Sequence, residues 1–267
     1  MLKIRVIPVL FLMNGLIVRS EGFGRFQVIG NPFGELERYS EWLADELVYV
    51  DITRDGEHEI QRQDHKVKSP TEIVDILRAI AEHAFMPLTF GGRLKTLAQA
   101  STFIANGADK VLVNTWAYRD PELVPAIARK FGRQATMVGI DVKRMPDNTL
   151  RMFVDQGREL VDVDPIDYAR LATNRGAGEI LLNSIDRDGA SEGYDVDAIR
   201  RIAEAVNVPV IACGGVGIPE HFVPAVRDSG AAAVAAGNMF HFTENAYKRA
   251  KRVLRQRGID VRYPYSA

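Results

Sequence analysis

The chain has 267 residues, of which 46% are hydrophobic, and this length is sufficient for one large domain with a complete core. Its 34 basic and 35 acidic residues are interspersed and leave a formal net charge of -1, which argues against nucleic acid or a membrane as a partner. The only cysteine, Cys213, lies in an apolar stretch, so it excludes an internal disulfide and suits a cytoplasmic location.

Eight short apolar runs, rich in Val and Ile, predict strands that are buried on both faces. In chain order they cover residues 4–12, 46–51, 86–90, 110–114, 136–142, 179–184, 208–213 and 232–236. Helical patterns follow them, over residues 33–44, 71–84, 96–106, 120–131, 165–175, 195–206, 219–229 and 244–257. Prolines at first turns, such as Pro165, and glycines after helix ends, such as Gly176, mark the helix limits.

This alternation of eight strands and eight helices predicts an α/β fold, a (βα)8 TIM barrel formed by residues 1–267 as a single domain. A doubly wound open sheet is the alternative. In a barrel of this kind the active site lies at the carboxyl ends of the strands. The loops that follow the strands are therefore the place to look for chemistry.

The second half of the chain repeats the first. Residues 51–56 recur as 184–189, residues 90–92 as 213–215, and residues 108–114 more loosely as 231–237. The repeat predicts two fused half-barrels, about residues 1–132 and 133–267. When the two halves are aligned by this repeat, the strand that ends near Asp141 corresponds to the strand that ends near Phe11. An acid of the second half thus corresponds to a phenyl ring in the first.

Glycines after the seventh and eighth predicted strands form a candidate phosphate site. Gly214 and Gly215 follow one strand, and Gly237 and Asn238 follow the next. Glycine lets an anion approach backbone amides, and these two loops commonly bind phosphate in this fold. The alternative is that the glycines serve only tight turns.

Gly91, Gly92 and Asn114 are the counterparts of these residues in the first half. They predict a second phosphate site, as expected for a ligand with phosphate at both ends. However, Arg93 and Trp116 place a guanidinium and an indole where a backbone cradle would be open. Whether this second site is intact is left open.

The loop after the second strand, residues 54–70, is long and almost wholly polar. It is predicted to be a solvated insertion, or else a lid or partner-docking loop on the active-site face. His58 and His65 lie in it, but no third ligand has a suitable spacing, so no metal is predicted.

Several segments, spread over nearly the whole chain, resemble the cyclase subunit of imidazole glycerol phosphate synthase: Arg5-Val-Ile-Pro8, Asp45-Glu-Leu-Val48, Gly91-Gly92, Ala108-Asp-Lys-Val111, Ile140-Asp141, Asp186-Arg-Asp-Gly189 and Gly193-Tyr-Asp195. The resemblance implies a barrel that receives ammonia from a glutaminase subunit docked on its N-terminal face. At its C-terminal face such a barrel joins ammonia to a diphosphorylated intermediate and forms an imidazole ring in histidine synthesis. It implies no metal and no cofactor.

The family uses two aspartates, at the ends of the first and fifth strands, as general acid and base. Asp141 matches the second, whereas Phe11 stands at the first and cannot exchange a proton, a loss that typically costs about 100- to 10,000-fold in rate. Asp188 is retained, and Arg19 stands where the family has a lysine on a mobile loop. The resemblance therefore implies Asp141 and Asp188 as catalytic residues and Arg19 as a phosphate-binding residue.

Charged residues at the starts of four predicted strands match the family's ring at the ammonia entrance: Arg5, Glu46, Lys110 and Glu179. Two cations and two anions can satisfy one another, whereas an unpaired charge in such a constriction would be costly. Ordinary salt bridges at the base of the barrel are the alternative. Asp109 corresponds to a docking acid on the glutaminase-facing surface.

An ammonia entrance combined with a missing catalytic acid resembles a paralogous branch that is associated with glycosyl amidation in bacterial lipopolysaccharide and other surface-polysaccharide synthesis. We therefore expect a barrel subunit of a glutamine-dependent amidotransferase complex, with a glutaminase, a sugar-amidating enzyme and a phosphorylated small molecule as partners. A true cyclase, which is a lyase, and a non-catalytic scaffold that activates the glutaminase are the alternatives. Whether the chain is itself an enzyme is left open.

Overall fold

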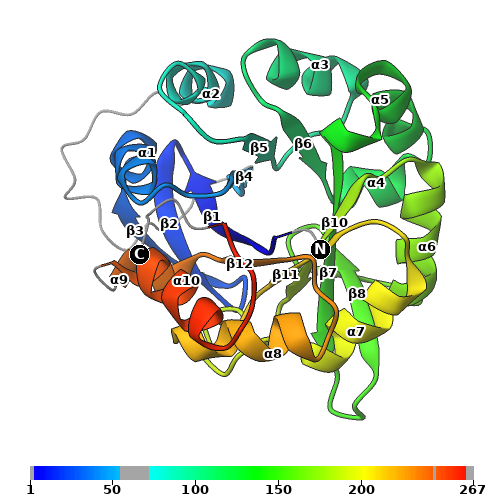
Figure 1. Ribbon diagram of the computed structural model, residues 1–267. Coiled ribbons are helices and arrows are strands. Elements are labelled where there is room, and N and C mark those ends of the chain that lie inside the picture. Colours follow the sequence, from blue (N-terminus) through cyan, green and yellow to red (C-terminus); the bar gives the residue numbers. More distant parts are fainter. Residues whose placement is uncertain (1–2, 55–71, 243–244, 263–267) are drawn as a thin grey trace.

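The structure is a computed structural model, which describes residues 3–54, 72–242 and 245–262. Eight parallel strands form a closed barrel (Figure 1): β1 (Arg5–Met13), β4 (Leu47–Asp51), β5 (Leu88–Gly91), β6 (Lys110–Val113), β7 (Thr136–Arg144), β10 (Glu179–Ser184), β11 (Val210–Cys213) and β12 (Ala233–Ala236). The pairing of β12 with β1 closes the ring. The predicted (βα)8 barrel is confirmed, and the open sheet is wrong because each of the eight strands has a parallel neighbour on both sides.

The helices surround the barrel (Figure 1): α1 (Pro32–Glu41), α2 (Ile73–Ala81), α3 (Leu97–Ala105), α4 (Thr115–Arg119), α5 (Leu123–Phe131), α6 (Pro165–Arg175), α7 (Val196–Ala205), α8 (Phe222–Arg227), α9 (Asn238–Phe242) and α10 (Ala246–Gln256). The side chains of Asn31 and Asp164 cap α1 and α6, each of which begins with a proline. The helix expected over 219–229 is instead a 3-10 turn, Pro219–His221, followed by α8.

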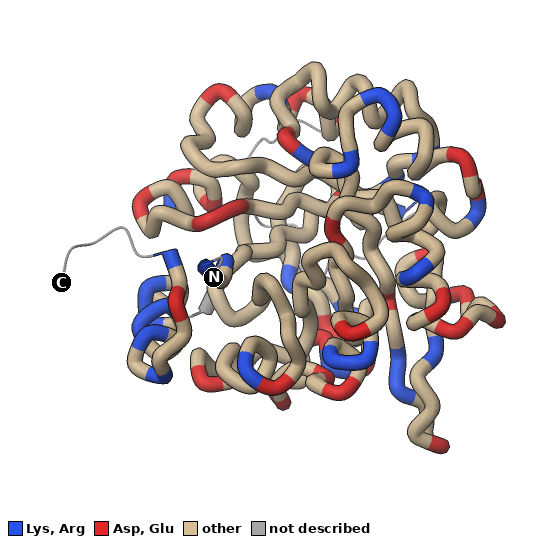
Figure 2. The backbone as a smooth tube through the Cα atoms, turned by 45° about the vertical axis from the view of Figure 1, so that its right-hand side comes forward, with Lys and Arg blue, Asp and Glu red and all other residues tan. Residues whose placement is uncertain are grey.

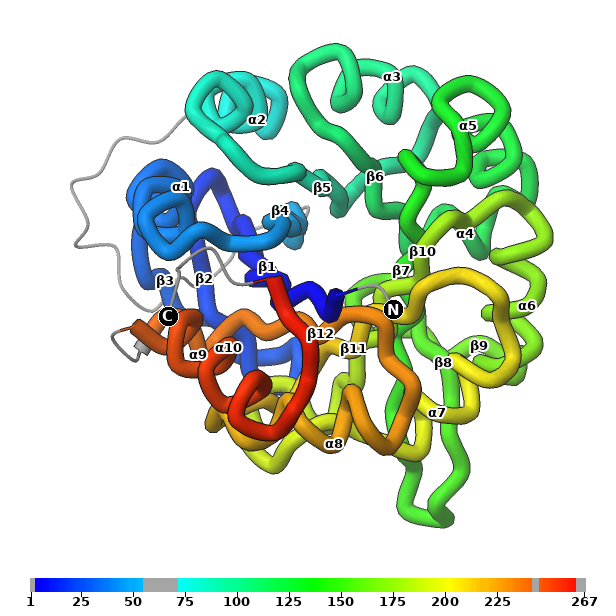
Figure 3. The backbone as a smooth tube through the Cα atoms, viewed as in Figure 1, coloured from blue at the N-terminus to red at the C-terminus, as the bar shows by residue number. Residues whose placement is uncertain are grey.

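Two antiparallel excursions, which the sequence pattern did not predict, lie where loops were expected. The first is the β2–β3 hairpin, formed by β2 (Leu16–Glu21) and β3 (Arg25–Gly30), and β2 also pairs with β1. The second consists of β8 (Leu150–Val154) and β9 (Glu159–Val161), which extend from the long strand β7. The turn that joins β7 to β8 projects away from the barrel (Figure 3). Both excursions follow strand ends and so belong to the face that carries the site.

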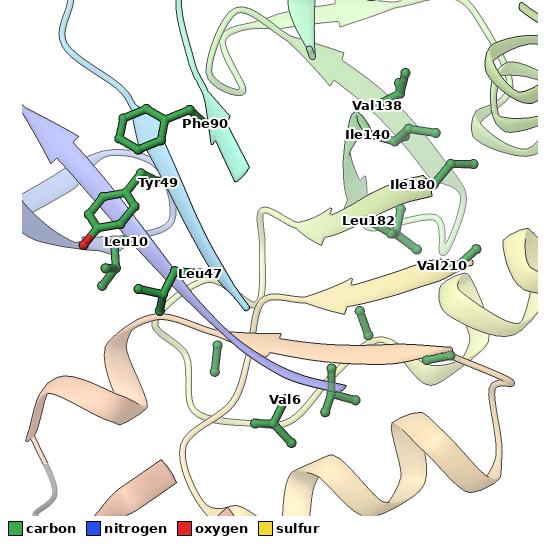
Figure 4. Packing of buried hydrophobic residues seen from close by; sticks show 14 of the residues in the cluster. Val6, Leu10, Leu47, Tyr49, Phe90, Val138, Ile140, Ile180, Leu182 and Val210 are labelled. Carbon is green, nitrogen blue, oxygen red and sulfur yellow. The ribbon is translucent and has the colours of Figure 1, made fainter. Parts of the chain in front are cut away.

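Successive side chains of each strand point alternately into the barrel and out toward the helices, and this divides the core into two parts. Val6 and Leu10 pack outward against the helices, together with Tyr49 and Phe90, whose rings stack with centroids 5.2 Å apart (Figure 4). A smaller cluster fills the barrel interior: Ile7, Val9, Val48, Leu112, Met137, Leu181, Ile211, Cys213, Ala233 and Ala235. Phe11 packs against this interior cluster, so it points into the barrel from the carboxyl end of β1.

The strand registers of the two halves place Phe11 and Asp141 at equivalent positions. Phe11 is paired with Val50 of β4, and Asp141 is paired with Asn183 of β10. Val50 and Asn183 each precede the first residue of the repeated segment, at positions 51 and 184. The correspondence expected from the sequence, an acid in one half and a phenyl ring in the other, is therefore found in the strand pairing.

The register corrects one part of the repeat. Val50 pairs with Gly91, and Asn183 pairs with Cys213. Gly91 is therefore equivalent to Cys213, and not to Gly214 as the sequence comparison suggested. The shift of one residue makes Gly92 equivalent to Gly214, and Arg93 equivalent to Gly215. Both members of each pair have positive φ angles, which supports the new alignment.

Charged residues of both signs alternate along most of the backbone (Figure 2), and helix α10 is an exception. Its sequence carries five basic residues, Lys248, Arg249, Lys251, Arg252 and Arg255, and no acidic one. Lys251 is buried and forms an ion pair of 2.8 Å with Asp45. The interspersion of charges expected from the composition therefore does not extend to this helix.

Candidate functional site

A cavity of about 340 Å³, the mouth cavity, opens at the carboxyl ends of the barrel strands. Phe11 and Asp141, the equivalent residues of the two halves, both line it. Its outer wall is formed by the segments that follow strands β4, β5 and β6, by the β2–β3 hairpin and by the turn between β8 and β9. The site thus lies where the fold predicts it.

Asp141 is the buried acid of the mouth cavity, with only 7% of its surface exposed. The pKa of its carboxyl is raised to about 7, mainly by burial; a hydrogen bond from Asn114 lowers it in part, and the nearby charge of Asp188 adds to the increase. Asn114 Nδ2 donates this bond to Asp141 Oδ2 at 2.8 Å. A carboxyl that titrates near neutrality is suited to both accepting and donating a proton.

Cys213 also lines the mouth cavity and is buried. Burial raises the pKa of its thiol to about 12, with smaller contributions from the charges of Asp188 and Asp141. A thiol with such a pKa carries almost no thiolate at neutral pH. The residue is therefore unsuited to act as a nucleophile.

Asp188 has a different setting from Asp141. Its carboxylate accepts hydrogen bonds from Ser20 Oγ at 2.6 Å and from the backbone N–H of Phe23 at 3.3 Å. Burial raises the pKa of Asp188, and these hydrogen bonds from the β2–β3 hairpin lower it in part. Asp188 does not itself line the cavity, whereas Ser20 does. Its predicted proton-carrying role is untested, and its observed contacts attach the hairpin to the barrel.

The glycines of the second-half phosphate site are closely packed. A Cβ atom at Gly215 would lie 2.1 Å from the carbonyl oxygen of Gly193, and one at Gly214 would lie 2.8 Å from Asn183 Oδ1. Asn238 Nδ2 donates to the carbonyl of Ser20 at 2.6 Å, and its Oδ1 accepts from Ser20 N–H at 3.3 Å. Gly214, Gly215, Gly237 and Asn238 do not line the mouth cavity. Tight packing is thus one reason for these glycines.

The first-half counterparts lie nearer to the cavity. Gly92 and Asn114 line it, while Gly91 is buried in the strand pair beside Leu112. A Cβ atom at Gly92 would lie 2.0 Å from the carbonyl oxygen of Asp51. Arg93 follows with a left-handed φ of 52° and also lines the cavity.

Several basic side chains of the cavity wall were missed by the sequence analysis: Arg54, Lys95, Arg119 and Arg158. Lys95 lies over the indole of Trp116, with its Nζ 5.8 Å from the ring centroid. Arg54 Nη2 donates to the carbonyl of Phe23 at 3.0 Å, and its Nε donates to Gln156 at 2.7 Å. The sequence analysis had named only Trp116 among these neighbours. The four basic residues carry no local signal, because they reach the cavity through the tertiary arrangement of loops, the β8–β9 turn and α4.

Two further predicted residues lie outside the cavity. Arg19 is in the middle of β2, next to Ser20, and neighbouring strand residues point to opposite faces. Asp109 is exposed at the amino end of β6, where its Oδ2 accepts a hydrogen bond of 2.8 Å from Leu88 N–H. The predicted 54–70 loop, including His58 and His65, lies outside the described residues except for Arg54.

At the opposite end of the barrel, Arg5, Glu46, Lys110 and Glu179 form a continuous ring of ion pairs, the charged ring. Arg5 contacts Glu46 at 2.7 Å and Glu179 at 2.8 Å. Lys110 contacts the same two carboxylates, at 2.9 Å and 2.6 Å. Each charge thus has two opposite charges as neighbours. The role of this ring as an ammonia entrance remains a prediction.

The charged ring is shielded from solvent. Glu46 is only 2% exposed and also accepts a hydrogen bond from Thr89 Oγ1 at 3.1 Å. Burial lowers the pKa of Arg5, but Glu179 and Glu46 outweigh this effect and raise it overall. Because buried charges of this kind depend on their partners, loss of one member is expected to disturb the others.

Within residues 3–54, 72–242 and 245–262, no three His, Cys, Asp or Glu side chains are grouped so that they could hold a metal ion. In the same ranges, no helix has the length and apolar character needed to cross a bilayer.

The fold and the mouth cavity together define a (βα)8-barrel protein with its site at the carboxyl ends of the strands. The family model described as histidine biosynthesis protein matches residues 5–246, which is nearly the whole chain. The chain therefore belongs to the histidine biosynthesis protein family. This result supports the resemblance noted in the sequence at the level of the family.

Proposed function

We propose that this chain is the barrel subunit of a glutamine-dependent amidotransferase complex in the cytoplasm. In this proposal a glutaminase docks on the N-terminal face, where Asp109 is exposed, and releases ammonia at the charged ring. The ammonia then serves the amidation of a sugar in surface-polysaccharide synthesis, together with a sugar-amidating enzyme. The observation that carries the proposal is the combination of a complete charged ring with Phe11 at the position equivalent to Asp141.

The two ends of the barrel support this proposal in different ways. Ring closure by the cyclase family needs two acid–base groups, and Phe11 supplies none. Loss of one such group lowers a rate by about 100- to 10,000-fold. An ammonia entrance, in contrast, needs only the charged ring, whose four members are all present and paired.

The interior cluster lies between the charged ring and the mouth cavity and is suited to neutral ammonia. It is wholly apolar and includes the small side chains of Ala233 and Ala235. Moving an ion through such an interior would require loss of its hydration, which is costly, whereas neutral ammonia carries no such charge penalty. The charged ring and the apolar interior together would favour passage of ammonia over ammonium.

Genetic complementation tests whether the chain is a cyclase. We expect that the wild-type gene does not restore growth of a histidine auxotroph that lacks the cyclase subunit, because Phe11 cannot carry a proton. A functional cyclase gene in the same vector is the positive control, and immunoblotting verifies that both proteins are made. Robust growth with the wild-type gene would overturn the proposal.

Nitrogen transfer tests the charged ring. The chain is assembled with its glutaminase, and glutamine labelled with ¹⁵N in the amide is supplied. Lys110→Ala opens the ring, so we expect more labelled ammonia in the solvent and less in the amidated product. Lys130→Ala, which removes an exposed lysine bonded to Ser101 on the outer helices, is the matched control. Unchanged transfer by Lys110→Ala would favour a scaffold that only activates the glutaminase.

A true cyclase is the second candidate, and the setting of Asp141 favours it. Its pKa of about 7 would let one residue act in turn as base and acid, with water in place of the missing group. Under this hypothesis the purified chain, given an ammonium salt, converts the family's diphosphate substrate, and Asp141→Asn abolishes the conversion. No turnover by the wild-type chain would exclude this candidate.

A further inference from the structure

The mouth cavity is lined by residues of only one of the two candidate phosphate sites, the first-half site. Gly92, Arg93 and Lys95, from the loop after β5, line it, and so do Thr115 and Trp116 from the first turn of α4. The equivalent loops of the second half, after β11 and β12, do not contribute their glycines or Asn238. A ligand in the cavity would therefore meet the phosphate-site residues of the first half and not those of the second, whose contribution to the wall includes Asp155, Gln156 and Arg158 of the β8–β9 turn.

The β2–β3 hairpin lies against the second-half loops after β10 and β12. Ser20 of the hairpin lines the cavity. Its backbone N–H and carbonyl both bond with the side-chain amide of Asn238, and its hydroxyl donates to Asp188. A Cβ atom at Gly189 would lie 3.0 Å from Glu21, so the hairpin and the loop after β10 are in close contact. These contacts engage the side chains of Asn238 and Asp188 and hold the hairpin against the loops after β10 and β12.

The cavity wall carries an excess of positive charge among the described residues. Five basic side chains line it, Arg54, Arg93, Lys95, Arg119 and Arg158, against three acidic ones, Asp51, Asp141 and Asp155. Arg158 pairs with Asp155 at 2.9 Å, and Arg119 pairs with Glu159. Lys95 has the face of Trp116 as its neighbour and pairs with no carboxylate of the described residues.

The backbone conformation of Arg93 is an independent indication that this wall of the cavity binds a ligand. It is equivalent to Gly215 and has a φ of 52°, a conformation that costs a side-chain-bearing residue roughly 1 kcal/mol. Strained residues of this kind are concentrated at ligand sites, where the side chain contributes to binding. Here the strain places a guanidinium at the cavity wall, where the second half has a bare backbone.

We propose that the mouth cavity binds a small molecule with a single anionic group, a phosphate monoester or a carboxylate, held by the side chains of Arg93, Lys95 and Arg119. The body of the ligand lies against Trp116, and its far end reaches Asp141. A ligand with anionic groups at both ends gains nothing from its second group, because the glycines and Asn238 of the second-half loops do not line the cavity. The inference takes sugar amidation as the reaction and so rests on the proposed function.

Tryptophan fluorescence measures this binding directly, because the chain has only two tryptophans, Trp42 and Trp116. In a Trp42→Phe background Trp116 is the sole reporter, and it lies in the cavity beside Lys95. The probes are inorganic phosphate, glucose 6-phosphate, glucuronate, glucose and fructose 1,6-bisphosphate. Broadening of the ³¹P signal of glucose 6-phosphate by the wild-type chain provides a second measurement that needs no substitution.

We expect saturable binding of glucose 6-phosphate or glucuronate, and the stronger of the two identifies the anion. Glucose should bind at least about tenfold more weakly, and the bisphosphate should bind within about threefold of the monophosphate. Lys95→Ala should weaken binding of the anionic probes by about five- to tenfold, which is the usual effect of losing one charge-assisted hydrogen bond. Lys130→Ala, outside the cavity, is the matched control and should have no effect.

Three results would overturn the inference. They are anionic probes that bind no better than glucose, a bisphosphate that binds more than about tenfold tighter than the monophosphate, and binding that is unchanged by Lys95→Ala. The assay reads binding alone. A negative result would therefore remove the ligand class but leave the ¹⁵N transfer through the charged ring, and hence the proposed function, to be judged separately.

Discussion

Asn114 of the first half-barrel, at the end of β6, donates a hydrogen bond of 2.8 Å to Asp141 of the second, on the neighbouring strand β7. The bond stabilises the ionised carboxylate, but burial outweighs it and keeps the pKa of Asp141 near 7. The acid is therefore held between its two protonation states at neutral pH. A pKa near 7 affects the pH dependence of stability as well as proton transfer.

The pKa of Asp141 predicts how stability depends on pH. Between about pH 4 and pH 7 the folded chain keeps this proton, while the unfolded chain, with its ordinary pKa of 3.8, releases it. The unfolded state then binds fewer protons, so this group lowers the free energy of unfolding as pH rises through that window. The contribution levels off above about pH 7.

Asp141→Asn removes this titration. We expect the variant to gain stability relative to wild type as pH rises from about 5 to about 8, by on the order of 2 kcal/mol. Urea unfolding of both proteins at several pH values measures the difference, and other groups cancel in the comparison. A difference that stays constant with pH would show that Asp141 titrates normally.

Phe11→Asp restores a carboxyl at the position equivalent to Asp141. Phe11 packs against the interior cluster, so we expect the free energy of unfolding at neutral pH to fall by about 2–4 kcal/mol. The new charge in the same cavity should also raise the pKa of Asp141. Urea unfolding and ¹³C NMR titration of the carboxyls measure the two effects, with Phe11→Leu as an uncharged control. A variant as stable as Phe11→Leu would contradict the prediction.

Glu46→Gln tests the energetics of the charged ring. The substitution keeps the shape of the side chain but leaves Arg5 and Lys110 with Glu179 alone. Because the group is buried, we expect a loss of about 3 kcal/mol in the free energy of unfolding, with little dependence on salt. Glu37→Gln, at an exposed position of α1, should change stability by less than about 0.5 kcal/mol. Equal effects of the two substitutions would count against a coupled ring.

Asn238→Ala should release the β2–β3 hairpin from the second half of the barrel. The substitution removes both hydrogen bonds to Ser20, and we expect amide hydrogen exchange in residues 16–30 to accelerate about tenfold. Hydrogen exchange with mass spectrometry measures the change peptide by peptide. Asn174→Ala, at an exposed position of α6, is the control. Unchanged exchange in the hairpin would mean that other contacts hold it.

Arg93→Gly and Arg93→Ala together test the backbone strain at the cavity wall. Both remove the guanidinium, but only glycine adopts the φ of 52° without a steric penalty. We expect Arg93→Gly to be more stable than Arg93→Ala by about 1 kcal/mol in thermal or urea unfolding. If alanine proved as stable as glycine, the left-handed conformation would carry no cost at this position.

The barrel could be predicted from the sequence because its signals are local. Buried parallel strands have apolar runs such as residues 179–184, and helix limits have proline and glycine, as at Pro165 and Gly176. The β2–β3 hairpin was missed although Asn14 and Gly15, at the β1–β2 turn, both have positive φ, which is typical of a tight hairpin turn.

The candidate site could be predicted only in part. Asp141 and Phe11 were found because the repeat aligns them, and strand pairing preserves that alignment. The alignment of Gly91 with Gly214 was wrong by one residue, because adjacent glycines match in either register. Lys95, in the loop after β5, and Arg119, the last residue of α4, were not found, since no local pattern tells which surface cation will face a cavity.

The sequence by itself determined the closed barrel, because hydrophobic periodicity is a property of neighbouring residues. The repeat identified Asp141, and the family resemblance identified the charges at the base. Only the tertiary structure decided which loop residues line the mouth cavity and where the β2–β3 hairpin lies. The hairpin is attached by the contact of Ser20 with Asn238, residues 218 positions apart. A contact of this range arises from the packing of the hairpin against the barrel, and no local pattern in either segment specifies it.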